Sequence, residues 1–321
     1  MTYPLNTAVY AVLIAFVASV VLCPILIPYL VKLKFGQFVR DDGPQSHLKK
    51  AGTPTMGGIM IMAAFLLSAL LFMQGNREGL VLVVVTLAFG LIGFWDDFIK
   101  ITKRRSLGLR AYQKWIAQVI VAVAFVAYAS TLPGFTTHIM VPFAPGVSWD
   151  LGVWYAPLVC FVILGAVNGA NFTDGLDGLN AGVTLLIVAF FIFTAWTMYS
   201  PILPITGAMA GSLLGFLLFN AYPARVFMGD SGSLPLGGFV AAVSVLLGMP
   251  LWLGIVALVY VIEVLSVIIQ VGYFRITGGK RFFKMAPIHH SFELSGWSET
   301  KVVAFFYVMT TIFCLIGYLA F

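Results

Sequence analysis

The sequence predicts an all-α integral membrane protein with many transmembrane helices. Only 9% of its 321 residues are charged and 61% are hydrophobic, whereas an ordinary soluble domain has about 25% charged residues. The mean hydropathy is +1.02. Apolar runs long enough to cross a hydrocarbon core of about 30 Å as a helix recur along the whole chain. The length of the chain therefore reflects membrane spans rather than soluble domains.

Hydropathy windows of about 19 residues indicate ten helices. They are expected near 7–31, 56–74, 79–99, 112–132, 153–170, 179–199, 202–220, 235–249, 251–274 and 301–320. Only Gly248 and Pro250 separate the eighth run from the ninth, so a single broken helix at this point is an alternative. Because no long linker or repeat divides the chain, we expect residues 1–321 to form a single transmembrane domain.

The positions of Lys and Arg predict the orientation. Ten alternating spans place most of these residues on one side, in the segments 32–50, 100–114 and 275–284, and leave Arg77 in a loop on the other side. Cytoplasmic loops carry an excess of Lys and Arg, so we expect these segments to be cytoplasmic and both termini to lie outside. The segment from Pro133 to Asp150 then becomes an external loop, whose turn residues favour a short hairpin.

Basic charge and cysteine content exclude two other classes of protein. The sequence pI of about 9.2 is accounted for by residues that set membrane topology, so no nucleic-acid partner is expected. The three cysteines lie in separate apolar runs without the spacing of a metal site or redox motif. We therefore expect the chemistry of this chain to depend on other side chains.

Paired aspartates end the third predicted helix, at Asp96 and Asp97. Two adjacent carboxylates repel each other, and a cation between them relieves that repulsion. Lys100 follows within one helical turn and can pair with either of them. A solvated helix end is the plainer alternative. Acidic residues contribute little to topology, so their position at the cytoplasmic rim favours a site.

A second polar group follows the fifth predicted helix. Asn168 and Asn171 are three residues apart and share a helix face, while Asp174 and Asp177 alternate with glycines that permit a tight turn beside a ligand. These carboxylates can accept hydrogen bonds from a base or a sugar. The spacing is not that of an EF-hand loop, but a structural turn with helix caps remains an alternative.

A third group precedes the eighth predicted helix and includes Asn220, Phe227 and Asp230. Glycines on both sides of Asp230 allow the backbone to approach a phosphate while the carboxylate holds Mg²⁺. A Walker A loop is excluded, because no Gly-Lys-Ser/Thr follows. Phe227 is a candidate for stacking on a nucleobase, and packing against the helices is an equally good interpretation.

Two histidines, His289 and His290, form a fourth group with Lys284 close by. Hydrogen bonding to a substrate phosphate suits this basic setting. A zinc site is a weaker interpretation, because neither cysteine nor HExxH spacing accompanies the pair.

A fifth group, with Lys50 and Thr55, opens the second predicted helix and suits either phosphate binding or attachment to the membrane surface. Glu263 lies within the ninth apolar run. An ionisable group at that depth is a functional candidate, with a helix-packing hydrogen bond as the alternative.

Together, the five segments resemble the phospho-N-acetylmuramoyl-pentapeptide transferase family, which belongs to a superfamily that transfers sugar-1-phosphates from uridine nucleotides to polyprenyl phosphate. The segments are KAGTPTMGG at 50–58, DDFIK at 96–100, NGANFTDGLDGL at 168–179, VFMGDSGS at 226–233 and APIHHSFE at 286–293. They occur in the family's order, and the resemblance covers nearly the whole chain.

The resemblance implies a Mg²⁺-dependent transferase of the bacterial inner membrane with ten helices and a cytoplasmic active site. Its substrates would be UDP-N-acetylmuramoyl-pentapeptide (UDP-MurNAc-pentapeptide) and undecaprenyl phosphate, in contact with the lipid bilayer. The products would be lipid I and UMP, in the first membrane step of peptidoglycan synthesis. Whether the chain forms a homodimer is left open.

The resemblance also implies roles for individual residues. Asp96 and Asp97 match paired catalytic aspartates, and Asp230 matches the magnesium ligand. His289 and His290 match the first two members of a triple-histidine motif, of which the third position here is Ser291. Positions that would bind substrate, on the phosphate side or the nucleoside side, are Lys50, Thr55, Lys100, Lys114, Asn168, Asn171, Asp174, Asp177, Asn220 and Phe227.

The sequence leaves several alternatives open for the reaction and for the class of protein. The lipid phosphate could attack the β-phosphate directly after Asp96 or Asp97 removes its proton, or one of these aspartates could form a covalent intermediate. A relative that transfers N-acetylglucosamine-1-phosphate to the same lipid would share the aspartate motifs. A transporter could use Glu263 and the carboxylates as an ion path, but most of the acids gather at one membrane face.

Overall fold

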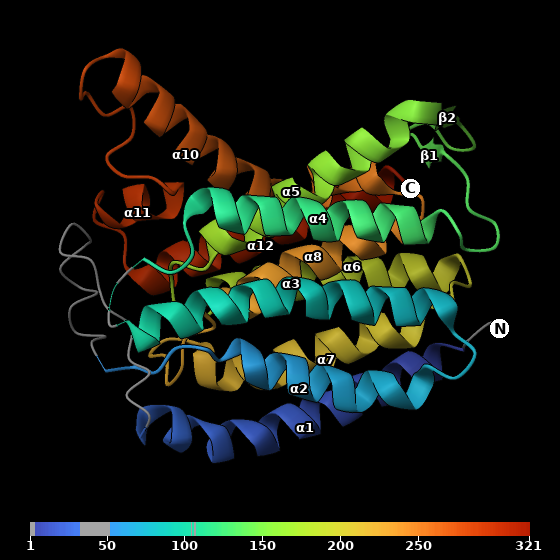
Figure 1. Cartoon of the computed structure of the whole chain (residues 1–321), viewed down its shortest axis with the longest axis horizontal. Coiled ribbons are helices and arrows are strands. Elements are labelled where there is room, and N and C mark those ends of the chain that lie inside the picture. The colour runs from blue at the N-terminus through green and yellow to red at the C-terminus, as the bar shows by residue number, and fades with distance from the viewer. Residues whose placement is uncertain (1–3, 33–51, 104, 106) are drawn as a thin grey trace.

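Helices make up nearly all of the structure, a computed structural model that describes residues 4–32, 52–103, 105 and 107–321. They run side by side as a bundle (Figure 1). The helices are α1 (Leu5–Lys32), α2 (Gly58–Ala69), α3 (Arg77–Thr102), α4 (Ala111–Ala129), α5 (Tyr155–Thr173), α6 (Leu179–Thr197), α7 (Leu203–Asn220), α8 (Asp230–Leu246), α9 (Leu253–Val256), α10 (Leu258–Ile276), α11 (Ile288–Glu293) and α12 (Glu299–Leu319).

The all-α membrane class is confirmed, because eight of the described helices are long and apolar enough to cross a membrane. The eight are α1, α3, α4, α5, α6, α7, α10 and α12. Two further apolar helices are shorter. α2 continues into the 3₁₀ turn Leu70–Phe72, and α8 has 17 residues. Most of α8 is buried, so protein rather than lipid surrounds this short helix.

Two predicted boundaries were wrong. The eighth helix begins at Asp230 rather than near 235, so the aspartate belongs to its first turn. The ninth run is interrupted at Ala257, where φ is −103° and ψ is 27°, and forms α9 and α10 instead of one helix. The separation at Gly248 is as predicted, because that residue has a φ of +69° and the chain turns there.

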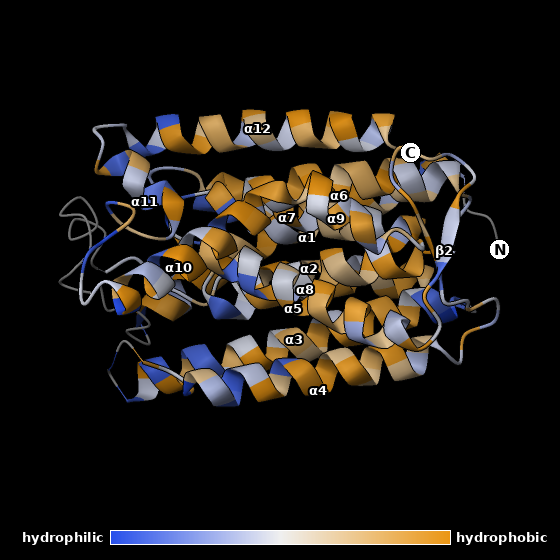
Figure 2. Cartoon of the chain, turned by 90° about the horizontal axis from the view of Figure 1, so that it is seen from above, coloured by the Kyte–Doolittle hydropathy of each residue, from blue (hydrophilic) through white to orange (hydrophobic). Residues whose placement is uncertain are grey.

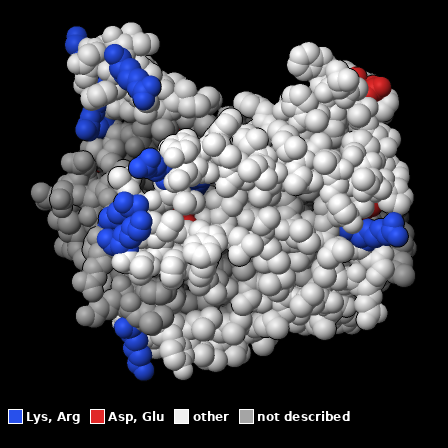
Figure 3. All heavy atoms as spheres, viewed as in Figure 1, with Lys and Arg blue, Asp and Glu red and all other residues white. Residues whose placement is uncertain are grey.

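The two ends of the bundle differ in chemistry. The predicted hairpin is confirmed as the antiparallel pair β1 (His138–Met140) and β2 (Ser148–Asp150), and α1 begins and α12 ends at the same end of the bundle as this hairpin (Figure 1). The opposite end carries α11, and hydrophilic residues lie toward both ends of the bundle while the middles of the helices are hydrophobic (Figure 2). Most of the Lys and Arg residues in view gather at the end that carries α11 (Figure 3).

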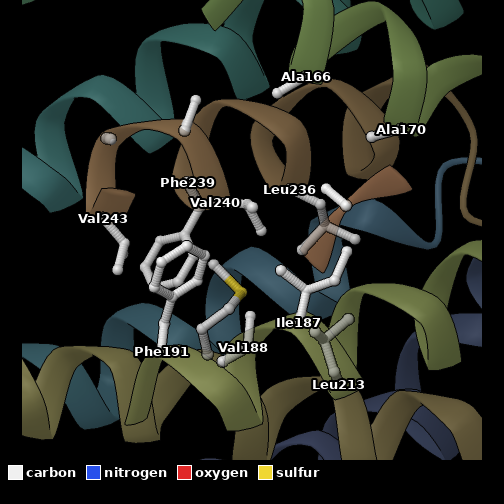
Figure 4. Close-up of a cluster of buried hydrophobic side chains, with 14 of the residues drawn as sticks. Ala166, Ala170, Ile187, Val188, Phe191, Leu213, Leu236, Phe239, Val240 and Val243 are labelled. Carbon is white, nitrogen blue, oxygen red and sulfur yellow. The ribbon is translucent and has the colours of Figure 1, made fainter. Parts of the chain in front are cut away.

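The central helix is α8, which packs against α3, α5 and α6. Side chains of α6 and α8, such as Phe191 and Phe239, point toward one another, and Ala166 and Ala170 face α8 from α5 (Figure 4). All four are buried. This packing fixes the position of the first turn of α8, where Asp230 lies.

Close contact between α1 and α7 depends on glycines spaced four residues apart. A Cβ atom at Gly207 would lie 2.7 Å from the carbonyl oxygen of Ala8, and one at Gly211 would lie 2.1 Å from that of Val12. Gly215 continues the row against Ser19. Small residues at this spacing let helix backbones approach closely in membranes, where dispersion contacts drive helix association.

Gly211→Ala should destabilise the bundle, because the added methyl group would overlap the α1 backbone. Overpacking of this kind costs about 1–3 kcal/mol. The matched control is Gly165→Ala in α5, where a Cβ would meet no atom within 4 Å and alanine is the better helix former. Thermal unfolding in detergent measures both variants. Equal unfolding midpoints would contradict the close α1–α7 packing.

Candidate active site

The site begins where α8 starts and α3 ends. A Cβ at Gly93 would lie 1.9 Å from the carbonyl oxygen of Asp230, and a Cβ at Gly58 would lie 2.1 Å from the amide nitrogen of Gly232. The first turn of α8 therefore touches the backbones of both α2 and α3. Only glycine permits this approach, which brings Asp230 beside the paired aspartates of α3.

Three carboxylates form the centre of the site. Asp96 and Asp97 are 3% and 2% exposed, and Asp230 is partly buried. One oxygen from each lies within 4.8 Å of the others, and in the described part of the chain they form the only group of three or more His, Cys, Asp or Glu residues that could hold a metal ion. The grouping expected from the sequence is thus present in three dimensions.

Two lysines compensate these buried carboxylates. The Nζ atom of Lys100 lies 2.6 Å from Asp96, 3.3 Å from Asp97 and 3.1 Å from Asp230. Lys114, from α4, lies 2.7 Å from the same Oδ2 atom of Asp230. Unpaired charges at this degree of burial would be strongly destabilising, so both lysines hold the cluster together electrostatically.

Backbone amides also donate hydrogen bonds to the two α3 aspartates. Asp97 accepts a hydrogen bond from the amide of Ser231 (2.9 Å), in the first turn of α8. The free amides of a helix N-terminus favour a negative charge. Asp96 accepts one from the amide of Leu109 (2.8 Å), in the loop that leads to α4. Each aspartate therefore also fixes a neighbouring segment of backbone.

Asn171 joins the cluster from α5. Its amide group donates to Oδ1 of Asp230 (3.0 Å) and to the hydroxyl of Ser233 (3.1 Å). Asp230 is thereby oriented by α4 through Lys114 and by α5 through Asn171. The clustered carboxylate oxygens suit Mg²⁺, which binds proteins through one or two carboxylates together with substrate phosphates.

Thr55 lies at the edge of the cluster. A Cβ at Gly229 would lie 2.8 Å from the hydroxyl of Thr55 and 2.5 Å from Oδ2 of Asp97. The segment around Thr55 runs beside the one around Phe227, because the Phe227 amide donates to the Pro54 carbonyl and the Gly57 amide donates to the Phe227 carbonyl, both at 2.8 Å. Lys50 lies outside the described residues.

Of the predicted nucleoside-side residues, Asp174 and Phe227 are partly exposed. Burial raises the pKa of Asp174 well above its ordinary value, and the charges of Asp230 and Asp97 act in the same direction. Asp174 and Phe227 are therefore available to a ligand beside the carboxylate cluster.

Asp177 and Asn220 instead hold the backbone of the loop before α8. Asp177, 4% exposed, accepts a hydrogen bond from the Ala224 amide at 2.9 Å. Asn220, also 4% exposed, donates to the Val226 carbonyl at 2.9 Å. These bonds shape the loop that presents Phe227. A direct contact with substrate remains a prediction for both residues.

Asn168 does not join the carboxylate cluster. Its amide donates to Oε1 of Gln118 on α4 and to the Leu164 carbonyl, both at 2.8 Å. Gln118 is 1% exposed and lies one helical turn from Lys114 on the same face. Asn168 therefore connects α5 to α4. Gln118 was not predicted from the sequence, although it lies four residues after Lys114 and therefore on the same helix face.

His289 is fully buried, which differs from the expected contact with phosphate. Its Nδ1 lies 3.0 Å from Oε1 of Glu263, whose other oxygen accepts the Ile288 amide at 3.0 Å. A Cβ at Gly175 would lie 2.1 Å from Nε2 of His289. Glu263 therefore connects α10 to α11, and the imidazole lies against the turn after α5. This arrangement fits the helix-packing alternative for Glu263.

His290 and Ser291 complete this motif differently. His290 is partly exposed, and its Nδ1 lies 2.8 Å from Glu293. Ser291, which departs from the triple-histidine motif, closes a loop by accepting the Met285 amide at 3.1 Å and donating to the carbonyl of the same residue. A carboxylate lies against Nδ1 of each histidine. Among the described residues, neither histidine belongs to a group of three or more possible metal ligands, which does not favour the zinc interpretation.

Two family models match this chain. Residues 79–248, which include the three clustered aspartates, match the Glycosyl transferase family 4, and residues 50–62 match the phospho-N-acetylmuramoyl-pentapeptide-transferase signature 1. The chain belongs to the phospho-N-acetylmuramoyl-pentapeptide-transferase family. The resemblance stated from the five segments is confirmed.

Curated members of this family align with nearly the whole chain. The phospho-N-acetylmuramoyl-pentapeptide-transferase of Clostridium kluyveri is 49% identical over 314 residues, which cover 97% of this chain and 98% of that protein. The enzyme of the same name from Acetivibrio thermocellus is 49% identical over 100% of this chain and 97% of its own length. That from Clostridioides difficile is 49% identical over 97% of both.

Gly93→Ala should disrupt the site, because its methyl group would overlap the backbone of Asp230 and push α8 away from α3. We expect transferase activity to fall by at least about tenfold, in line with the cost of small displacements in catalytic sites. Gly90→Ala, one turn earlier on α3, is the control, since its Cβ would have only ordinary contacts with Pro235 at 3.7 Å. Activity assays on folded protein compare the two. Full activity of Gly93→Ala would contradict the described α3–α8 contact.

Proposed function

We propose that this chain transfers phospho-N-acetylmuramoyl-pentapeptide from its UDP-activated form to undecaprenyl phosphate, giving lipid I and UMP. The observation that carries the proposal is the cluster of Asp96, Asp97 and Asp230 around Lys100, in a chain that belongs to this transferase family. Phosphoryl transfer depends mainly on positioning and on stabilising negative charge. Carboxylates with adjacent lysines meet both needs.

The same three aspartates would hold Mg²⁺. Their oxygen atoms lie close together and are hard ligands of the kind this cation prefers. When bound, Mg²⁺ would neutralise the diphosphate of the nucleotide and polarise its phosphorus–oxygen bonds. Lys114 and Asn171 would keep Asp230 in its orientation.

In the proposed reaction, an oxygen of the lipid phosphate attacks the β-phosphorus of the nucleotide. The bond from this phosphorus to the bridging oxygen breaks, and UMP leaves with the electron pair. Asp96 or Asp97 would accept the proton of the lipid phosphate.

The uridine would bind beside Phe227, which is partly exposed at the edge of the cluster and offers a ring for stacking. Asp174 would contact the nucleoside from the turn after α5. Asp177 and Asn220 would contribute by holding the loop in place. Partly exposed His290 is better placed than buried His289 to meet the substrate.

The site would face the cytoplasm of the bacterial inner membrane, with α2 and α8 added to the eight longer spans to make ten. Two observations support this orientation. Basic residues gather at the end of the bundle that holds the site (Figure 3), as expected for a cytoplasmic face. α1 begins and α12 ends at the opposite end (Figure 1), as an even number of crossings requires.

The named relatives do not favour the N-acetylglucosamine-1-phosphate alternative. A UMP-release assay distinguishes the two nucleotides. The purified protein with undecaprenyl phosphate and Mg²⁺ should release UMP from UDP-MurNAc-pentapeptide and much less from UDP-N-acetylglucosamine. Asp230→Asn should lower release by about 10³-fold or more, as removal of a main electrostatic contributor does.

Asp150→Asn is the matched control, because this exposed aspartate lies in the hairpin at the other end of the bundle. It should leave UMP release unchanged. Near-normal activity of folded Asp230→Asn would refute the role of the cluster, and preferred use of UDP-N-acetylglucosamine would refute the proposed substrate.

A further inference from the structure

Lys100 occupies the centre of the carboxylate cluster. Its Nζ atom lies within 3.3 Å of an oxygen from each of Asp96, Asp97 and Asp230. These are the same three residues whose oxygens could hold a metal ion. The ammonium group and a divalent cation would therefore use the same electron pairs on the same oxygens.

Lys114 has a different position. Its Nζ contacts Oδ2 of Asp230 at 2.7 Å, and it approaches from α4 rather than from the helix that bears the paired aspartates. It therefore lies beside one ligand instead of among all three. The two lysines carry equal charge, so the difference between them is one of location.

Simultaneous binding of both cations at the centre is unfavourable. Mg²⁺ holds its oxygen ligands at about 2.0–2.1 Å and requires near-octahedral geometry. An ammonium group that stayed within hydrogen-bond distance of the same oxygens would repel the doubly charged ion. Three carboxylates and two lysines leave a single net negative charge, which is a weak attraction for a divalent cation unless a lysine moves away.

Lys100 is able to move. Its side chain is 30% exposed, compared with 19% for Lys114, and it lies in the last turn of α3. Four rotatable methylene groups give a lysine a long reach. Rotation about these bonds can take the ammonium group out of the cluster.

We propose that Lys100 and the divalent cation are alternative occupants of the carboxylate cluster, and that Lys100 leaves for the substrate phosphates when the cation binds. This inference rests on the metal site of the proposed function. Without the cation, Lys100 contacts all three carboxylates, offsets part of their charge and preserves their arrangement. With the cation, its positive charge becomes available to the diphosphate.

Lysine labelling of the wild-type protein tests the exchange without any variant. Residue-level mass spectrometry would follow acetylation by a water-soluble amine reagent with and without Mg²⁺, in the absence of substrate. Labelling of Lys100 should rise several-fold when Mg²⁺ is added, and labelling of Lys114 should change less. Unchanged or reduced labelling of Lys100 would overturn the proposal.

The affinity for a divalent cation gives a second test, in which removal of a side chain from the site should strengthen binding. Lys100→Met should bind Mn²⁺ more tightly than wild type, by about tenfold, since a nearby positive charge commonly changes a proton affinity by 1–3 pKa units. Lys114→Met removes the same charge and serves as the matched control, with a smaller increase expected. Titration of substrate-free protein by electron paramagnetic resonance measures both.

The outcomes separate this inference from the proposed function. Mn²⁺ binding to wild type that Asp230→Asn abolishes would support the metal site whatever Lys100→Met does. Unchanged or weaker binding by Lys100→Met would overturn the exchange alone, as would equal gains in the two lysine variants. If Lys100→Met does not fold, the labelling experiment on wild type still decides.

Discussion

The contact between the end of α3 and the start of α8 is the constraint on which the site depends. Gly93 lets the two backbones touch at Asp230, and the Ser231 amide of α8 then bonds Asp97 of α3 at 2.9 Å. Because α8 is buried among α3, α5 and α6, this position cannot relax independently of the bundle. Apolar helix packing thus determines where three carboxylates meet.

Burying those carboxylates is costly, and the fold offsets the cost with nearby positive charge and backbone amides. Lys100 and Lys114 supply the charge, while Ser231 and Leu109 supply the amides. The same features suit a transferase, since a preorganised set of charges needs little rearrangement when negative charge develops on a diphosphate. Stability and catalysis therefore both require these charges and amides to be held in fixed positions.

Much of the site could be predicted from the sequence, because its residues lie at helix ends within short motifs. Asp96, Asp97, Lys100 and Asp230 come together as expected. Local sequence could not reveal the hydrogen-bond partners of buried polar side chains, because these partners depend on how neighbouring helices are rotated relative to one another. Asn168 consequently bonds Gln118, and His289 bonds Glu263 beneath the surface. The helix break at Ala257 could not be predicted either, because no glycine or proline occupies that position.

Locating the metal ion tests the proposed carboxylate site most directly. Crystals of the protein grown with Mn²⁺ and measured at the manganese absorption edge would show its position by anomalous scattering. We expect a peak within coordination distance of Asp230 and between the α3 and α8 carboxylates, with the Lys100 side chain turned away from them. A peak at His289 and His290 instead, or none near Asp230 at saturating Mn²⁺, would contradict the proposed site.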